Sequence, residues 1–179
     1  MDQSIRPFLA LIAMPLRVLS KRAQTKEHLM SLIERPSLAQ LVPDAYRAVS
    51  GVEAYIRGCG LEKSLIELVK MRASQINGCA FCLDMHSKDA RKDGETEQRL
   101  YLLNAWREAP FYSKRERAAL EWTERLTRLC GEGIPADARD RLAAVFSPVE
   151  IANLTVLVCL INLWNRAAIG GGFHLPAAA

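Results

Sequence analysis

The sequence predicts an all-α protein built as a single domain, and three observations support this. Apolar residues recur with the 3.6-residue period of an amphipathic helix from one end of the chain to the other. No segment alternates apolar and polar residues between hairpin turns, as the strands of a sheet would. The chain has 179 residues, half of them hydrophobic, which suffices for one good core without requiring a second.

Six helices are expected along the chain. Their ranges are 44–58, 62–76, 79–92, 96–106, 114–129 and 148–169. Glycines, which tolerate left-handed backbone, mark the ends of the first three, within Gly58-Cys59-Gly60, at Asn77-Gly78 and at Gly94. Asn77 or Gly78 is also expected to cap the start of the third helix, and Thr96 or Glu95 to open the fourth.

The last expected helix is apolar on nearly every face, which places it at the centre of the core or at a subunit contact. Ser147 followed by Glu150 has the capping-box spacing that starts it, and Ser113 with Glu116 starts the helix before it in the same way. One polar stripe interrupts its apolar surface and is expected to line a cavity, a subunit contact or a seam in the core. The stripe consists of Thr155, Cys159, Asn162 and Arg166.

Charge and cysteine content narrow the class of protein. The formal net charge of +4 is spread along amphipathic segments, without a recognised nucleic-acid motif, so no nucleic-acid partner is expected. An odd number of cysteines in a chain able to fold without disulfide staples indicates a reducing compartment, so a cytoplasmic protein is expected. Pro15 and Arg17 interrupt the apolar run from Phe8 to Leu16, which argues against a signal peptide. The apolar stretch from Ile151 to Leu163 is too short to span a bilayer, so no membrane association is expected.

The expected domain covers residues 45–169, with an arm before it and a tail after it. Residues 1–44 form an N-terminal arm that mixes apolar and basic side chains and is expected to dock on a neighbouring subunit. Pro7 and Pro15 disfavour the alternative of a long helix lying on a membrane surface. Residues 170–179 begin with three glycines and are expected to form a loose tail.

Two cysteines, a histidine and a glutamate within twenty residues form the pattern most typical of chemistry in this chain. On a helix, residues three and four apart are neighbours, so Cys79 and Cys82 share one face and His86 lies one turn beyond Cys82. Glu67 falls on the flank of the apolar stripe of the preceding helix, within reach of a neighbouring helix. The four side chains are therefore candidates for one site.

This arrangement can form, protonate and break a disulfide. At a helix start, the macrodipole and the free N–H groups stabilise a thiolate. His86 can accept a proton from a thiol, and Glu67 can hold the imidazole in one tautomer or pass a proton to the second sulfur. A thiolate attacked by peroxide becomes a sulfenic acid, which a second thiol one turn away converts to a disulfide.

Other interpretations of the same residues are weaker. Zinc is disfavoured because the remaining histidines and cysteines show no second paired spacing. A thioredoxin-like fold would place its CxxC motif after a strand, and no such strand is expected. Taken alone, Glu67 would be an ordinary helix carboxylate that pairs with Lys63 or Lys70. Neither a metal nor a cofactor is therefore expected.

The pattern Glu67-x11-Cys79-x2-Cys82-x3-His86 resembles the signature of the AhpD-like alkylhydroperoxidases, within the carboxymuconolactone decarboxylase superfamily. The stretches 67–69, 72–79 and 115–120 also look like those of a subgroup of small proteins in that superfamily. The resemblance covers roughly residues 45–168. It implies an AhpD-like helical bundle whose subunits assemble as a trimer or a hexamer.

The same resemblance implies a thiol-dependent peroxidase of antioxidant defence, which reduces alkyl hydroperoxides and is recharged by an external dithiol donor. Cys82 would be the peroxidatic thiol, Cys79 the resolving thiol, and His86 and Glu67 the proton relay. Some relatives have a histidine at the position of Phe81, so a relay step through that imidazole is unavailable here. Two alternatives stay open: a carboxymuconolactone decarboxylase-like lyase, with the histidine and glutamate as acid and base, and a redox-sensing module without catalysis.

Overall fold

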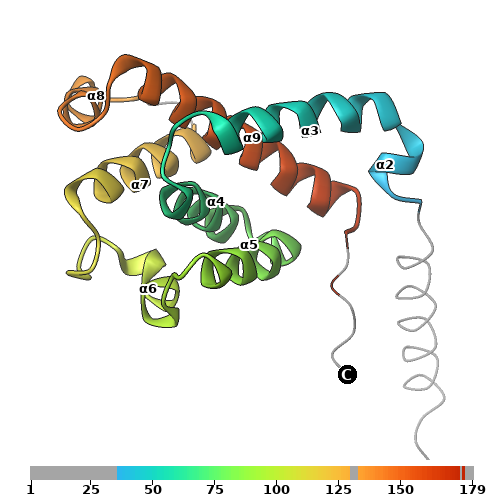
Figure 1. Cartoon of the computed structure of the whole chain (residues 1–179), viewed down its shortest axis with the longest axis horizontal. Helices are drawn as coiled ribbons and strands as arrows, with labels where there is room; N and C mark the ends of the chain where they lie inside the picture. The colour runs from blue at the N-terminus through green and yellow to red at the C-terminus, as the bar shows by residue number, and fades with distance from the viewer. Residues whose placement is uncertain (1–35, 130–132, 174, 176–179) are drawn as a thin grey trace, which may run out of the picture. The chain divides into compact units, whose positions relative to one another are not determined.

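The computed structural model describes residues 36–129, 133–173 and 175, and over these ranges all regular structure is helical (Figure 1). In order, the elements are α2 Leu38–Leu41, α3 Pro43–Gly58, α4 Lys63–Asn77, α5 Ala80–Lys92, α6 Glu97–Tyr101, the 3₁₀ turn η1 Leu103–Ala105, α7 Lys114–Thr127, α8 Ala136–Ala143 and α9 Pro148–Gly170. The all-α prediction is confirmed for this part of the chain. The described residues from Ser37 onward belong to one compact unit, and residues 1–35 of the predicted arm lie outside the described ranges.

Local signals located most helix ends to within one or two residues. Ser113 and Ser147 each form the expected capping box, in which the serine hydroxyl and a glutamate three residues later exchange hydrogen bonds with the backbone. Gly78 adopts left-handed backbone with φ +68° and ends α4. The predicted starts and ends of α3, α4, α7 and α9 are therefore close to those observed.

The prediction of one helix over 96–106 is wrong. Thr96 caps α6 as expected, but α6 ends at Tyr101 and the turn η1 follows. Trp106 is buried, and its Nε1–H donates a hydrogen bond to the carboxylate of Glu124 on α7, at 2.9 Å. This contact with a helix distant in sequence overrides the local helical pattern. The short helices α2 and α8 were not predicted, because four and eight residues are too few for a clear helical period.

The helix α4 lies at the centre of the bundle, with α5 below it and α9 above it in Figure 1. It packs against α5, α7 and α9. Nine of its fifteen residues are buried, among them Leu65, Leu68 and Val69 in the hydrophobic clusters. Because three helices surround α4, its partly polar flank also faces protein, and that flank carries Glu67.

The helix α9 has one side in the core, as predicted. Eight of its 23 residues are buried. The expectation that this segment is too short to span a bilayer counted only residues 151–163; the whole helix, 23 residues, is long and apolar enough to cross a membrane, a test that core helices of soluble proteins pass as well. In the predicted polar stripe, Thr155 accepts a hydrogen bond from Trp122 Nε1 at 3.1 Å and Asn162 donates one to Thr127 at 3.0 Å. These two residues form a satisfied seam, whereas Cys159 is exposed.

A buried carboxylate on α7 ties three parts of the chain together. Glu124 accepts hydrogen bonds from Arg72 Nε at 2.7 Å, from Trp106 Nε1 at 2.9 Å and from Arg107 Nη1 at 2.7 Å. Burial by itself would raise the pKa of Glu124, but the hydrogen bonds from Trp106, Arg107 and Arg72 outweigh it and hold this pKa below its usual range. The carboxylate is therefore charged in the folded protein at neutral pH.

Candidate active site

The two cysteines of the CxxC motif lie at the start of α5, immediately after the turn that leaves α4. The left-handed Gly78 makes this turn tight, and the N–H of Cys79 donates to the carbonyl of Ser74 at 3.1 Å. Cys79 itself is the N-cap of α5, which corrects the expectation that Asn77 or Gly78 would fill that position. Because the cap is one of the two cysteines, the sulfur atoms sit where the free N–H groups of the helix point.

Cys79 and Cys82 are paired as a disulfide, with their Cα atoms 5.4 Å apart. The N–H of Cys82 donates to Sγ of Cys79 at 3.3 Å. The two residues are only 1 % and 2 % exposed. This pairing of the residues three apart is the one that the helical spacing predicted. In the reduced pair, the same hydrogen bond and the helix dipole would both stabilise a thiolate at Cys79.

Aromatic side chains cover the disulfide. Phe81 and Phe173 pack in the same cluster as the two cysteines and Ala168, with the two rings edge to face and their centroids 5.3 Å apart. The N–H of Phe173 donates to the carbonyl of Ala168 at 2.8 Å, across the left-handed Gly172 with φ +66°. Phe173 lies in the stretch predicted to be a loose tail, so sequence reasoning missed it as part of the site's surroundings. Its aromatic side chain after a glycine run was the available signal.

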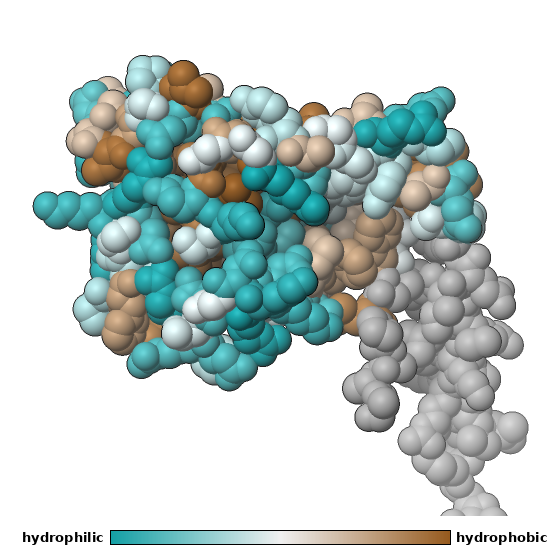
Figure 2. All heavy atoms as spheres, viewed as in Figure 1, coloured by the Kyte–Doolittle hydropathy of each residue, from teal (hydrophilic) through white to brown (hydrophobic). Residues whose placement is uncertain are grey.

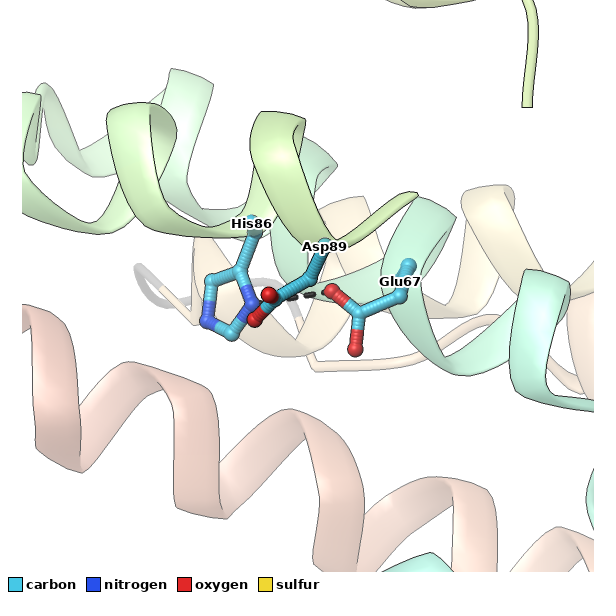
Figure 3. Close-up of side chains that lie close together, drawn as sticks. All are labelled: Glu67, His86 and Asp89. Carbon is cyan, nitrogen blue, oxygen red and sulfur yellow. Dashed lines mark hydrogen bonds and ion pairs between the residues drawn. The ribbon is translucent and has the colours of Figure 1, made fainter. Parts of the chain in front are cut away.

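His86, four residues after Cys82 on α5, meets Glu67 of α4, and Figure 3 shows the two side chains pointing toward one another. Nδ1 of His86 and Oε2 of Glu67 are 2.9 Å apart, and the two side chains are 7 % and 12 % exposed. A carboxylate can only accept a hydrogen bond, so Nδ1 is the donor in this contact; in a neutral imidazole Nε2 is then the ring nitrogen with a free lone pair. The structure thus brings together the histidine and the glutamate that the sequence pattern indicated.

Two further charged residues belong to the surroundings of Glu67. Nζ of Lys70 lies 3.9 Å from Oε1 of Glu67 and donates to Oε1 of Glu53, on α3, at 2.5 Å. The sequence pattern offered Lys70 as a partner for Glu67 but gave no indication of Glu53. That residue is fourteen positions before Glu67 on another helix, so only the packing of α3 against the bundle reveals it.

A metal ion fits this site poorly. One ligand atom each from Glu67, His86 and Asp89 lies within 4.8 Å of the others, and Figure 3 shows the three side chains gathered between α4 and α5. However, Glu67 and His86 are already hydrogen-bonded to one another, Asp89 is exposed, and the buried ammonium of Lys70 places a positive charge beside the carboxylate. The three residues are better suited to moving protons than to holding a cation.

The fold and the site together define a class of protein: an all-helical bundle with a CxxC pair at a helix start and an imidazole–carboxylate pair one turn along the same face. The chain belongs to the carboxymuconolactone decarboxylase family, whose family model matches residues 42–125. Within that family its relatives include AhpD-like proteins, which confirms the resemblance drawn from the sequence.

Two similar proteins support the assignment, and a third shares the fold. The uncharacterized protein YdfG of Bacillus subtilis is 40% identical over 139 residues, which cover 78% of this chain and 95% of YdfG. The crystal structure of ATU0492 from Agrobacterium tumefaciens, a protein of unknown function whose suggested name is antioxidant defence protein AhpD, is 45% identical, with a TM-score of 0.77; the match covers 80% of this chain and 99% of that one. The apo debrominase Bmp8 has a TM-score of 0.68 at 20% identity, covering 75% of this chain and 73% of that one, which is a likeness of fold alone.

Proposed function

We propose that the protein is a thiol peroxidase, which reduces alkyl hydroperoxides through the Cys79–Cys82 pair and serves antioxidant defence. The observation that carries this proposal is the geometry of the pair. Two cysteines close enough to be bonded lie at the N-terminus of α5, with a hydrogen-bonded histidine and glutamate one turn away. The suggested name of ATU0492, antioxidant defence protein AhpD, agrees with it.

The proposed cycle has three steps. The Cys82 thiol gives its proton to His86, and the thiolate attacks the terminal oxygen of the hydroperoxide, breaking the O–O bond. The alkoxide takes up a proton to leave as an alcohol, and Cys82 becomes a sulfenic acid. Cys79 then attacks the sulfenic sulfur, forming the disulfide and releasing water. An external dithiol donor finally returns two electrons and two protons, becoming a disulfide itself.

The dithiol favours this function over the two alternatives. A lyase with His86 and Glu67 as acid and base has no use for two cysteines three residues apart. A redox sensor has no need of a hydrogen-bonded imidazole–carboxylate pair beside its disulfide. The likeness to a debrominase shows that this fold also occurs in a protein with another named activity, so the choice depends on the site and not on the fold.

Mass spectrometry of the thiols tests the proposal directly. The reduced protein, given one equivalent of an organic hydroperoxide, is expected to lose two free thiols and to yield a peptide pair crosslinked through Cys79 and Cys82. The buffer without peroxide serves as the control. Two untouched thiols would contradict the peroxidase, and turnover of a lactone substrate after both cysteines are alkylated would support the lyase instead.

We further propose that the protein works as a homo-oligomer, a trimer or a hexamer, in the cytoplasm. Five exposed residues of α9 recur three and four positions apart, which is the spacing by which one helix packs along another. They are Val149, Ala152, Val156, Cys159 and Leu163. Figure 2 shows, by contrast, that polar side chains cover most of one face of the molecule. The free thiol of Cys159 on this row suits a reducing compartment.

The mass in solution, from sedimentation or light scattering, checks the oligomer. A multiple of the 20.0 kDa chain mass is expected, and Val156→Glu is expected to lower it because a charge then lies in the middle of the apolar row. Gln98→Glu, which adds the same charge on exposed α6, is the matched control. A monomeric wild-type protein would contradict the oligomer, and an unchanged Val156→Glu mass would place the contact elsewhere.

A further inference from the structure

Glu67 has one partner at each oxygen of its carboxylate. Oε2 meets Nδ1 of His86 at 2.9 Å, and Oε1 lies 3.9 Å from Nζ of Lys70. Lys70 is only 3 % exposed, and burying an ammonium is costly unless anions accompany it. The burial of a lysine beside a candidate catalytic carboxylate therefore indicates a specific role for its charge.

Lys70 belongs to a row of alternating charge that spans two helices, α3 and α4. Nζ donates to Glu53 on α3 at 2.5 Å, and Glu53 also pairs with Arg57 at 3.5 Å. The row runs from Arg57 through Glu53 and Lys70 to Glu67, so two cations and two carboxylates balance before the imidazole is reached. Asp89, on the histidine's own helix, also has an oxygen within 4.8 Å of a ring nitrogen, and it is exposed.

We propose that Lys70 is a positioning residue of the site, which counters the charge of Glu67 at Oε1 and leaves Oε2 to orient the imidazole of His86. A carboxylate without a counter-charge stabilises the protonated imidazolium beside it. An imidazolium has no lone pair with which to accept a proton from a thiol. With Lys70 in place, Glu67 fixes the Nδ1–H tautomer while Nε2 keeps its lone pair. Only the transfer of a proton from the Cys82 thiol to His86 rests on the proposed peroxidase function. The balance of charge between Lys70 and Glu67 does not depend on it.

The test is a pH titration of the His86 ring by NMR in the oxidised protein. The chain has three histidines, and loss of one signal in His86→Gln assigns it. Lys70→Met is expected to move the midpoint of the His86 titration to higher pH, by about one unit, because Glu67 is then unopposed. Glu53→Gln is expected to move it to lower pH, because the full charge of Lys70 then acts on Glu67.

Controls separate this electrostatic role from a structural one. Loosened packing would not produce shifts of opposite sign in the two variants. Lys70→Arg keeps the cation and is expected to leave the midpoint near that of the wild type, as is Lys63→Met, which removes an exposed lysine from the same helix. If Lys70→Met does not fold, the other two variants still test the inference, since Glu53→Gln should lower the midpoint and Lys70→Arg should leave it unchanged. Unmoved midpoints, or shifts of the same sign, overturn the inference.

Turnover provides a second readout that depends on the proposed function. In Lys70→Met, the acid limb of the pH profile of kcat/KM for an organic hydroperoxide is expected to shift to higher pH together with the NMR midpoint. In Lys70→Arg, it is expected to lie at the wild-type pH. If the midpoints shift as expected while no variant and no wild-type protein consumes hydroperoxide, the charge balance stands and the peroxidase is wrong. A profile that stays fixed while the midpoint moves would overturn the part of the inference that links Lys70 to proton transfer.

Discussion

Replacing Cys82 by serine is expected to abolish dithiol-dependent consumption of an organic hydroperoxide, with a loss of about a thousandfold or more in kcat/KM. A serine hydroxyl in the same place is a far weaker nucleophile toward the O–O bond, and it cannot form a disulfide with Cys79. The measurement is the rate at which a hydroperoxide disappears in the presence of a small dithiol. Cys159→Ser, a small change in the α9 row that leaves the CxxC pair, His86 and Glu67 intact, is the matched control and is expected to keep the full rate per subunit.

The companion variant Cys79→Ser distinguishes the roles of the two thiols. The hydrogen bond from the N–H of Cys82 to Sγ of Cys79 favours negative charge on Cys79, whereas the position one turn before His86 favours proton transfer from Cys82. If Cys82 is peroxidatic, Cys79→Ser still consumes one equivalent of hydroperoxide and then stops, with Cys82 trapped as a sulfenic or sulfinic acid. A full rate in Cys82→Ser would contradict the proposed site, and a single turnover in that variant would exchange the two roles.

Helix starts and stops could be predicted because their causes are local. Ser113 and Ser147 form their capping boxes with residues three positions away, and Gly78 and Gly94 have the positive φ that the sequence suggested. The break of the expected helix at 96–106 has a distant cause. Trp106 turns into the core to reach a carboxylate eighteen residues further on, and no local pattern carries that information.

The residues of the candidate site also fall into those that a local pattern predicts and those that depend on distant contacts. Cys79, Cys82 and His86 lie on one helix, so their spacing alone placed them on one face. Glu67 could be predicted as a member of the same site because a tight turn at Gly78 joins α4 to α5 and makes the two helices neighbours. The pair Glu53 and Lys70 depends on the position of α3, which packs against α9. The ring of Phe173 depends on the direction in which the chain leaves α9. No local sequence pattern predicts either contact.

The largest effect on stability is expected from Glu124→Gln. Arg72, 7 % exposed, is held by the Glu124 carboxylate through Nε and Nη2, both at 2.7 Å. A neutral amide cannot balance that buried cation, and its NH₂ group cannot accept the hydrogen bonds that one carboxylate oxygen accepts. Breaking a buried ion pair by removing one partner costs about 3–5 kcal/mol. For a chain of this length the midpoint of thermal unfolding should fall by roughly 6–20 °C.

The pH dependence of this difference has a definite sign. Hydrogen bonds outweigh burial and hold the pKa of Glu124 below its usual range in the folded protein. A carboxyl whose pKa is lowered on folding contributes stability that is fully present above its unfolded pKa, about 4.3, and is lost as the pH falls through its folded pKa. The gap in unfolding free energy between wild type and Glu124→Gln should thus be constant near neutral pH and should narrow on acidification below about pH 4.

A matched variant on the same helix tests whether burial is the cause. Glu121 pairs with Arg141 at 2.7 Å, but Arg141 is about half exposed, so water screens the pair and replaces the lost partner. Glu121→Gln should therefore change the melting temperature little, at the same protein concentration and pH. Equal losses in Glu121→Gln and Glu124→Gln, or a gap that widens in acid, would mean that the Arg72–Glu124 contact is not what holds α4 and α7 together. A large and acid-sensitive gap confined to Glu124→Gln would instead show that the fold around α4, the helix that presents Glu67 and Lys70 to the site, depends on this one carboxylate for its stability.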